Sequence, residues 1–460
     1  MADVPPIPHQ AIPNPYIPNT DADRALMLDR LGLTSIDDLF EELPAAHRSP
    51  AIDVPIALAE ADLVRMLAER AAENVTNRPS FLGAGAYRRA IPTITAHLAG
   101  RSEFATSYTP YQPEISQGTL QAAFEYQSVV CELSGLDVSN TGMYDAASAT
   151  AEACLLAVRV TRRRAVALLE PIHPNTIDVV RMYAYGGDVR VDVVREASEI
   201  TDEHACLVVQ QPDFLGGIAD VQALADAAHE AGALCVVVAD PLALGLLRAP
   251  GDAGADLVTG EGRDLAGPMT FGGPSLGLFA ARETFLRQMP GRIVGRAPEL
   301  HPPAGAPHDA PARIGYVLTL QAREQFIRRE RATSNFSTGQ SLIATAFTIT
   351  MQTLGPQGLR ESAELCYQKA HDAARRIAAL PGYTITSPGA WFQEFLVRGE
   401  KPAAVIASAL AEHGIVPGLD VSDRAEPEAH EALLFCVTEA TPAAHVDALV
   451  QALSEIGGRS

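Results

Sequence analysis

Residues Val236–Arg282 read VVVADPLALGLLRAPGDAGADLVTGEGRDLAGPMTFGGPSLGLFAAR, and this stretch decides the fold. An apolar run ends in Asp240, a second strand-like segment covers Asp256–Thr259, and a glycine-rich turn leads to a third at Leu276–Ala281. Strands that end in an acid and alternate with helical segments are typical of a parallel α/β sheet. In such sheets the chemistry lies at the carboxyl ends of the strands. The stretch therefore predicts an α/β domain with its site near Asp240.

The same stretch lacks one residue that its pattern leads us to expect. In enzymes built around pyridoxal phosphate, an aspartate holds the pyridine nitrogen and a lysine further along forms a Schiff base. Asp240 stands where that aspartate is expected, but the region near Arg263 and Asp264 offers no amine. The chain has only two lysines, Lys369 and Lys401, both far downstream. We therefore predict a pyridoxal-enzyme scaffold that binds no cofactor covalently and serves a partner that holds it.

The composition is that of a globular enzyme, with 460 residues, 47% hydrophobic and 20% charged. A net charge of −21 and the lack of a long basic run argue against nucleic acid as a partner. Six cysteines without a CxxC pair fit a reducing cytoplasm, and the scattered histidines predict no metal site. No stretch approaches the about 20 apolar residues that cross a bilayer. We expect a soluble, cytoplasmic protein without a secretory signal.

Alternation of strands and helices is clearest between residues 165 and 281. Strands are predicted at Ala165–Leu169, Val189–Val193, Cys206–Gln210, Leu234–Ala239, Asp256–Thr259 and Leu276–Ala281. Helices are predicted at Gly118–Ser134, Asn175–Tyr185 and Asp220–Glu230. Right-handed crossovers then give a mostly parallel sheet with helices on both faces.

Shorter patterns set the expected domain limits. Residues 1–20 are proline-rich and expected to be extended, Thr20 caps a helix that Gly32 ends, and Leu58–Asn74 is an amphipathic helix. Residues 290–313 are predicted to form a loop. Further helices are predicted at Arg360–Leu380, Pro402–His413 and Ala443–Ile456, with strands near Glu394–Val397 and Leu433–Val437. We expect an N-terminal helical segment and extended arm (1–95), a large α/β domain (96–330), and a linking helix with a small α+β domain (331–460).

Several blocks of sequence carry a resemblance to a known family. They read YIPNT, LTSIDDLFEELP, FLGAGAYRRAIP, YTPYQPEISQG, EGRDLAGPMTFGGPSLGLFA, GRIVG, GYVLTLQAREQFIRRERATSN, GIVPGLDV and LLFCVTEAT. Together and in this order, over nearly the whole chain, they resemble subunit 1 of the decarboxylating glycine dehydrogenase, the P-protein of the glycine cleavage system. The family usually reads FLGAGAYDHYIP and REQHIRRE, where this chain has Arg88, Arg89 and Phe326. The segment SNICTNQ of the family is also altered here, and the proline-rich segment around residues 302–311 is unusual.

The resemblance implies a pyridoxal phosphate-dependent enzyme fold of type I and a split enzyme. In that family subunit 2 carries pyridoxal phosphate on its lysine, and subunit 1 joins it in an α2β2 heterotetramer. The complex is a glycine dehydrogenase (aminomethyl-transferring) of glycine catabolism. It decarboxylates glycine and passes the aminomethyl group to the lipoyl arm of the H-protein. Subunit 1 is expected to contribute active-site walls at the interface and no catalytic lysine.

Three segments are expected to form this active-site interface. They contain Tyr108, Thr109, Tyr111, Gln112 and Glu114; then Thr270, Gly272 and Gly273; and finally Arg331, Thr333, Ser334 and Asn335. Phenols and an amide on the first segment can donate hydrogen bonds while they exclude water. Backbone amides of the second can approach a phosphate on the neighbouring subunit, and the arginine of the third can bind a carboxylate. For each residue the alternative is a role in interface packing or helix capping.

Two other functions fit the residues. The chain could be an autonomous pyridoxal enzyme, such as an aminotransferase or a cysteine desulfurase, that uses Lys369 or Lys401. It could also be a non-catalytic scaffold or regulator that has kept only the fold. Borohydride reduction with peptide mapping tests the first alternative, and substitution of Tyr111 tests the second.

Overall fold

The computed structural model describes residues 16, 19–48, 53–299, 307, 311–424 and 426–457. The chain divides into two compact units, Met1–Thr76 and Asn77–Ser460. The predicted extended arm at residues 1–20 and the segment at residues 302–311 lie largely outside the described residues. Within the part of the chain described, no helix is both long enough and apolar enough to cross a membrane.

The N-terminal unit consists of helices that bury none of their own residues. Its helices are α1 (Asp21–Leu31), η1 (Ile36–Phe40), η2 (Ala45–His47) and α2 (Glu60–Ala72). At the predicted start of α1, Thr20 Oγ1 accepts a hydrogen bond from Asp23 N at 3.2 Å. The helix ends as predicted at Gly32, whose φ of 73° suits glycine. Leu39, Phe40 and Val64 are among the exposed apolar side chains, so this unit has apolar surface that its own fold does not cover.

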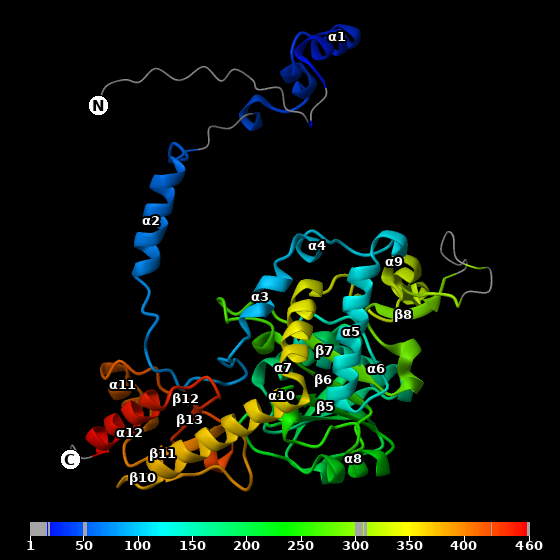
Figure 1. The fold of residues 1–460 in the computed structure, drawn as a ribbon. Coiled ribbons are helices and arrows are strands. Elements are labelled where there is room, and N and C mark those ends of the chain that lie inside the picture. The colour runs from blue at the N-terminus through cyan, green and yellow to red at the C-terminus, as the bar shows by residue number, and fades with distance from the viewer. Residues whose placement is uncertain are drawn as a thin grey trace, which may run out of the picture. The chain divides into compact units, whose positions relative to one another are not determined.

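The second unit is built around a seven-stranded sheet of order β1-β7-β6-β5-β4-β2-β3 (Figure 1). Its strands are β1 (Val138–Ser139), β2 (Ala165–Leu169), β3 (Arg190–Val194), β4 (His204–Gln211), β5 (Leu234–Ala239), β6 (Leu257–Glu261) and β7 (Gly277–Ala281). The strands from β6 to β3 are parallel, as predicted. β7 runs antiparallel to β6 and to β1. Residues 262–276, which include the short helix η6 (Arg263–Leu265), connect β6 to β7.

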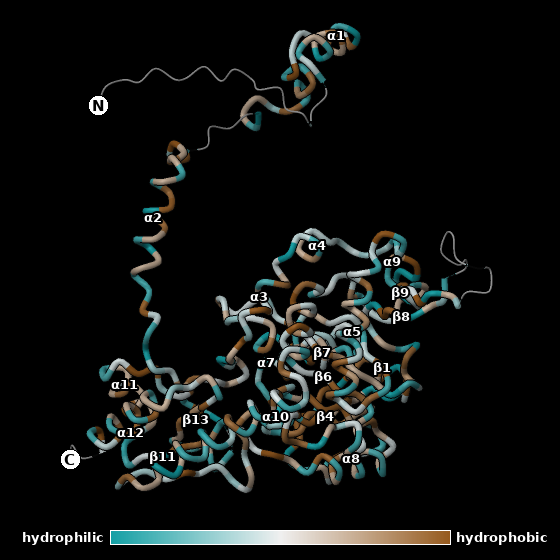
Figure 2. The backbone as a smooth tube through the Cα atoms, viewed as in Figure 1, coloured by the Kyte–Doolittle hydropathy of each residue, from teal (hydrophilic) through white to brown (hydrophobic). Residues whose placement is uncertain are grey.

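Both faces of the sheet are covered by helices. One face packs against α5 (Gln117–Ser134), α8 (Val221–Glu230) and α10 (Ser341–Ala378), and the other against α6 (Ala146–Thr161) and α7 (Pro174–Tyr185). Alternate residues of β5 enter the two cores, with Val237 in one and Val236 and Val238 in the other. This explains why the strand reads as a continuous apolar run, and Figure 2 shows the strands as mostly hydrophobic.

A smaller antiparallel sheet completes the unit. It contains β10 (Tyr383–Ile385), β11 (Glu394–Gly399), β13 (Ala432–Cys436) and β12 (Leu419–Asp420), with α11 (Ala403–Glu412) and α12 (Ala443–Gly457). Trp391 packs in the core of this sheet. The long helix α10 runs from the large sheet to the small one (Figure 1) and bends at Gly355, where φ is 61°, just before Pro356.

One prediction for this unit is wrong. Residues 290–313 were expected to form a loop, but β8 (Ile293–Pro298) pairs with β9 (Ile314–Thr319) in a two-stranded antiparallel ribbon. Glycine and proline lower the strand signal of β8, and its partner lies beyond the proline-rich segment. Strand β8 is therefore recognised only from its pairing with β9 in the structure. Short helices precede and follow this part of the chain: α3 (Thr93–Ala99), α4 (Ser102–Ala105) and α9 (Gln325–Arg328).

Candidate active site

One pocket, of about 550 Å³, opens at the carboxyl ends of β4, β5 and β6. We call it the strand-end pocket. Gln210, Asp240 and Glu261 line it from the ends of these three strands, and Asp145 lines it from the start of α6. Parallel α/β sheets bind their ligands at this edge. The sequence thus placed Asp240 correctly at a strand end, in a pocket.

Asp240 is bound by a side chain that comes from far away in the sequence. Arg89 Nη2 donates to Asp240 Oδ2 at 3.1 Å, and Arg89 Nη1 donates to Gln393 Oε1 at 2.8 Å. The same Nη1 lies 3.4 Å from Glu439 Oε2. The Arg89 side chain is only 1% exposed. A buried guanidinium therefore links the end of β5 to residues of the small sheet.

Two further carboxyl groups fix the chain around Arg89. Tyr87 N donates to Asp264 Oδ2 at 2.9 Å, and the Tyr87 hydroxyl donates to Glu394 Oε2 at 2.7 Å. Ala84 N donates to the other oxygen of Glu394 at 2.6 Å. Burial raises the pKa of Glu394 to about 7 and also raises the pKa of Asp264. The stability of this cluster should therefore depend on pH.

The N-terminus of α6 is occupied by a carboxylate of the chain itself. Glu261 accepts hydrogen bonds from three backbone amides, those of Ala146 at 3.2 Å, Arg263 at 3.0 Å and Leu276 at 2.8 Å. Burial raises the pKa of Glu261 to about 7, although the three amides act in the opposite direction. Of the three, only the Ala146 amide belongs to the start of α6, where helix amides form a natural anion site, and Glu261 occupies it.

The strand-end pocket does not fit covalently attached pyridoxal phosphate. Arg263 stands where the lysine is expected, and it donates from Nε to Asp264 Oδ1 at 3.1 Å. Lys369 Nζ donates to the carbonyl oxygens of Glu439 and Thr441, and Lys401 Nζ donates to that of Ile456. Neither lysine lines the pocket. No step through the cofactor can be assigned to a side chain of this chain.

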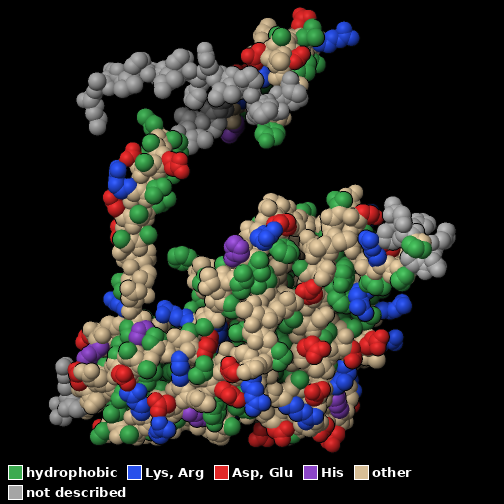
Figure 3. Space-filling model, viewed as in Figure 1, with side chains coloured by type: hydrophobic (Ala, Val, Ile, Leu, Met, Phe, Trp, Pro, Cys, Tyr) green, Lys and Arg blue, Asp and Glu red, His purple; other side chains and the backbone are tan. Residues whose placement is uncertain are grey.

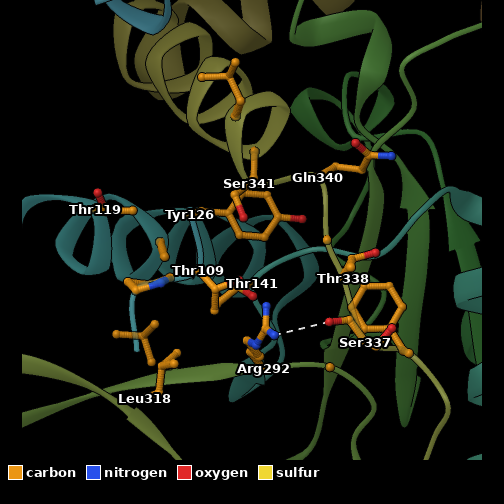
Figure 4. A pocket seen from close by; sticks show the side chains of 18 of the residues that line it. Thr109, Thr119, Tyr126, Thr141, Arg292, Leu318, Ser337, Thr338, Gln340 and Ser341 are labelled. Carbon is orange, nitrogen blue, oxygen red and sulfur yellow. Dashed lines mark hydrogen bonds between the residues drawn. The ribbon is translucent and has the colours of Figure 1, made fainter. Parts of the chain in front are cut away.

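A second pocket, of about 460 Å³, lies between α5, the β8–β9 ribbon and the start of α10 (Figure 4). We call it the arginine pocket. Thr119 and Tyr126 line it from α5, and Leu318 lines it from β9. Figure 4 shows Arg292 between Thr109 and Ser337. The lining also holds the guanidinium groups of Arg292 and Arg323 and the carboxyl group of Glu324. Hydroxyl groups on an apolar wall with these charged groups suit a small polar group.

Arg292 is held by the first predicted segment. Its Nη2 donates to the Tyr111 hydroxyl and to the Ser337 carbonyl, each at 3.2 Å, and its guanidinium lies 5.5 Å from the centre of the Tyr111 ring. Among the described residues, no hydrogen bond uses Arg292 Nη1. Arg292 lies in the block GRIVG but was not among the predicted site residues. Its only distinguishing feature in the sequence is that it is the single cation of an otherwise apolar block.

The predicted residues of the first segment separate in space. Tyr108 and Thr109 line the arginine pocket, and Tyr111 supports it through Arg292. Gln112 and Glu114 line neither pocket; Gln112 closes the short turn η3 (Pro113–Ile115) through its carbonyl oxygen. Tyr108 is largely exposed, so its side chain is accessible to another molecule.

The glycine-rich loop lies between the two pockets. Gly272 lines the strand-end pocket, whereas Pro274, two residues later, lines the arginine pocket. Thr270 and Gly273 are the ends of a tight turn, in which Gly273 N donates to Thr270 O at 3.0 Å. Phe271 at the tip has a φ of 47° and is fully exposed. The loop thus presents an aromatic ring to its surroundings.

The third segment contributes only part of what was predicted. Thr333 and Ser334 line the arginine pocket. Ser334 Oγ donates to the buried Glu152 at 2.7 Å, so this serine anchors the loop. The Arg331 side chain is 83% exposed, and neither Arg331 nor Asn335 lines a pocket. Arg292, not Arg331, is the arginine that lines this pocket with the predicted residues, and its Nε lies 3.9 Å from Glu324 Oε1.

Comparisons with known proteins identify the family. A sequence model described as glycine cleavage system P-protein matches residues 14–453. A probable glycine dehydrogenase (decarboxylating) subunit 1 from Thermomicrobium roseum is 44% identical over 454 residues, covering 96% of this chain and 99% of the relative. The protein of the same name from Moorella thermoacetica is 45% identical over 452 residues, with the same coverage.

The chain belongs to the P-protein family. Among solved structures, glycine decarboxylase (P-protein) of the glycine cleavage system in inhibitor-bound form is 40% identical, with a TM-score of 0.85. That match covers 96% of this chain and 99% of the other. The resemblance inferred from the sequence blocks is thereby confirmed.

More distant structures bear on the fold alone. A sphingosine-1-phosphate lyase from Burkholderia pseudomallei is 16% identical with a TM-score of 0.59, covering 90% of this chain and 94% of that chain. The lyase C-DES with glycine linked to its pyridoxal phosphate is 13% identical with a TM-score of 0.58, covering 83% and 97%. The predicted α/β fold of the type I pyridoxal phosphate-dependent enzymes is confirmed. This P-protein chain shares their scaffold.

Proposed function

We propose that this P-protein chain is the subunit of glycine dehydrogenase (decarboxylating) that does not bind the cofactor. It assembles with subunit 2 in an α2β2 heterotetramer, which decarboxylates glycine and passes the aminomethyl group to the lipoyl arm of the H-protein. The observation that carries this proposal is a near full-length match to subunit 1 sequences in a chain with no lysine in its strand-end pocket. Six free cysteines, five of them buried, suit a reducing cytoplasm, where we place the complex.

Exposed apolar side chains support assembly with a protein partner. Tyr108, Ile115 and Phe271 are exposed around the arginine pocket and the adjacent loop. In Figure 3 the charged side chains crowd the lower part of the view, around α8, and are sparser around α3 and α4. The N-terminal unit adds exposed apolar residues of its own. Exposed apolar and aromatic groups of this kind are typical of surfaces that a partner covers.

The chain's contribution to the reaction is positioning. Pyridoxal phosphate, when bound by the partner, would supply the electron sink for decarboxylation. Arg292, steadied by Tyr111, can orient a carboxylate or another polar group at the interface. The walls of the arginine pocket exclude water, and orientation of reacting groups can supply about 7–11 kcal/mol of a barrier when fully used.

The assay that tests this proposal is glycine-dependent exchange of labelled CO2. We expect no exchange with the purified chain alone and full exchange after subunit 2 is added, with both chains in one complex by size-exclusion chromatography. Exchange by this chain alone would contradict the proposal. Borohydride reduction followed by peptide mapping would then show whether Lys369 or Lys401 had formed an imine, as an autonomous enzyme requires.

A substitution separates a site-building subunit from a passive scaffold. We expect Tyr111→Phe to lower CO2 exchange by the complex about tenfold, because Arg292 loses a hydrogen bond while the ring stays in place. The matched control is Tyr185→Phe, since Tyr185 is exposed at the end of α7. Unchanged exchange by an intact Tyr111→Phe complex would favour the scaffold.

A further inference from the structure

Carboxyl groups outnumber cations in the strand-end pocket. It is lined by two guanidinium groups, those of Arg89 and Arg263, and by six carboxyl groups, those of Asp145, Asp178, Asp240, Glu261, Asp264 and Glu394. Burial raises the pKa values of Glu261, Asp264 and Glu394, so that part of this charge is neutralised by protons. A phosphate carries nearly two negative charges at neutral pH and needs cations or amides to bind it in such a pocket. Cations and amides are both present in this pocket, but carboxyl groups of the chain already bind them.

The first of these groups is the cation at Asp240. In a pyridoxal enzyme the strand-end aspartate binds the protonated pyridine nitrogen. Here Arg89 Nη2 takes that place at 3.1 Å, and Gln393 Nε2 donates to the same oxygen at 3.1 Å. The remaining oxygen of Asp240 accepts from Leu242 N at 2.9 Å. Both oxygens of the Asp240 carboxylate therefore already accept hydrogen bonds from the chain itself.

The second is the set of amides around Glu261, one of which lies at the start of α6. In α/β sheets a helix N-terminus at the carboxyl edge binds phosphate. Here Glu261 accepts a hydrogen bond from Ala146 N at that N-terminus, and two more from Arg263 N and Leu276 N, which lie after β6 and before β7. Glu261 thus supplies the acceptor atoms that phosphate oxygens would supply, and a negative charge when it is ionised.

Residues 83–90 carry Arg89 into the pocket, and we call them the plug segment. Three of their backbone amides donate to acids: Ala84 N to Glu394, Tyr87 N to Asp264, and Ala90 N to Glu439 at 2.8 Å. Gly83 allows the entry, because a Cβ atom there would lie 2.5 Å from Cys436 Cβ. The segment is fixed at both ends and in its middle.

We propose that the chain's own side chains occupy the charge positions of a coenzyme in the strand-end pocket, with Arg89 in place of the pyridinium and Glu261 in place of the phosphate. The pocket is thereby closed to pyridoxal phosphate and serves as the seat of the plug segment. This inference rests on the proposed function, since it explains how this subunit leaves the cofactor to its partner. It attributes the failure to bind the cofactor to Arg89 and Glu261 as well as to the missing lysine.

The test uses the full chain and probes that cannot form an imine. These are inorganic phosphate, pyridoxine and pyridoxine 5′-phosphate, measured by equilibrium dialysis and by the shift of the melting temperature. We expect no binding to the wild-type chain. Glu261→Ala frees three amides, so phosphate should raise its melting temperature by about 2–4 °C. Pyridoxine 5′-phosphate should bind Glu261→Ala about tenfold or more tightly than it binds the wild type.

A second experiment tests Arg89, which stands in place of the pyridinium. Adding Arg89→Gln to Glu261→Ala should improve binding of pyridoxine and its phosphate, but not of inorganic phosphate, because only the ring can use Asp240. Glu283→Ala, which removes an exposed acid, is the control and should behave as the wild type does. A folded Glu261→Ala variant with no response to phosphate would overturn the proposal. So would tight binding of pyridoxine 5′-phosphate to the wild type, which decides the matter even if the variants do not fold.

These outcomes are independent of the activity assay. A wild-type chain that binds the probes would overturn the closed pocket, while CO2 exchange with subunit 2 could still occur. Failure of that exchange, with no probe binding by the wild type, would overturn the proposed function alone.

Discussion

We expect Arg89→Met to lower the free energy of unfolding by about 3–5 kcal/mol. Methionine keeps much of the length of the side chain but removes the cation that faces Asp240 and Glu439. Removal of one partner from a buried ion pair is costly because it leaves a charge without compensation in a medium that solvates it poorly. The Glu439 side chain is 7% exposed and that of Asp240 is 14% exposed, so water reaches neither group freely.

The effect should reach beyond the ion pair itself. Arg89 joins the end of β5 to Gln393 and Glu439 of the small sheet, so its loss loosens contacts between the two parts of this unit. Urea unfolding followed by circular dichroism measures the change. Arg88→Met is the matched control, since its side chain is exposed, and it should stay within about 0.5 kcal/mol of the wild type. A loss at Arg89 as small as at Arg88 would show that the buried contacts contribute little.

The second large effect concerns pH. Burial raises the pKa of Glu394 to about 7 in the folded chain from an ordinary value of 4.5. Between these values the folded protein holds a proton that the unfolded chain has released. The free energy of unfolding therefore falls as the pH rises through this window and is constant again above it, by about 3 kcal/mol in total for this group. Glutamine at position 394 does not titrate, so this part of the pH dependence disappears.

We expect the stability of Glu394→Gln relative to the wild type to rise by about 2–3 kcal/mol between about pH 5 and about pH 8. The comparison across pH cancels the fixed effect of the substitution on packing and on the hydrogen bonds to Ala84 and Tyr87. Urea unfolding at a series of pH values is the measurement, with Glu283→Gln as the exposed control. A difference that does not change with pH would mean that Glu394 ionises normally in the folded protein.

The two variants probe one cluster from opposite sides. Removal of Arg89 takes away the cation that favours the ionised carboxylates, whereas Glu394→Gln takes away one of the carboxylates. Because their side chains share the neighbours Tyr87 and Asp240, their effects should not add. We expect Glu394→Gln to recover part of the stability that Arg89→Met loses at about pH 8.

The sequence by itself determined the scaffold. Apolar runs such as that of β5 predict buried parallel strands, because a strand covered on both faces can carry almost no polar residue. The acid at the end of that run, and the absence of an amine after it, predicted a strand-end site without the usual lysine, whereas the structure showed that Lys369 and Lys401 do not line it. Local signals such as the Thr20 cap and Gly32 were equally readable, since their partners lie within a few residues.

Only the tertiary structure decided what occupies the pocket. Arg89 lies 151 residues from Asp240 and 304 from Gln393, and no local pattern connects such positions. Arg292 was missed and Arg331 was selected for the same reason: an arginine's role depends on what its guanidinium meets in space, and here one lines a pocket while the other is exposed. Hydrophobic periodicity fixes the strands and helices because burial acts along each element. The pairing of charges is settled only when distant segments meet, since buried ions are stable only next to their partners.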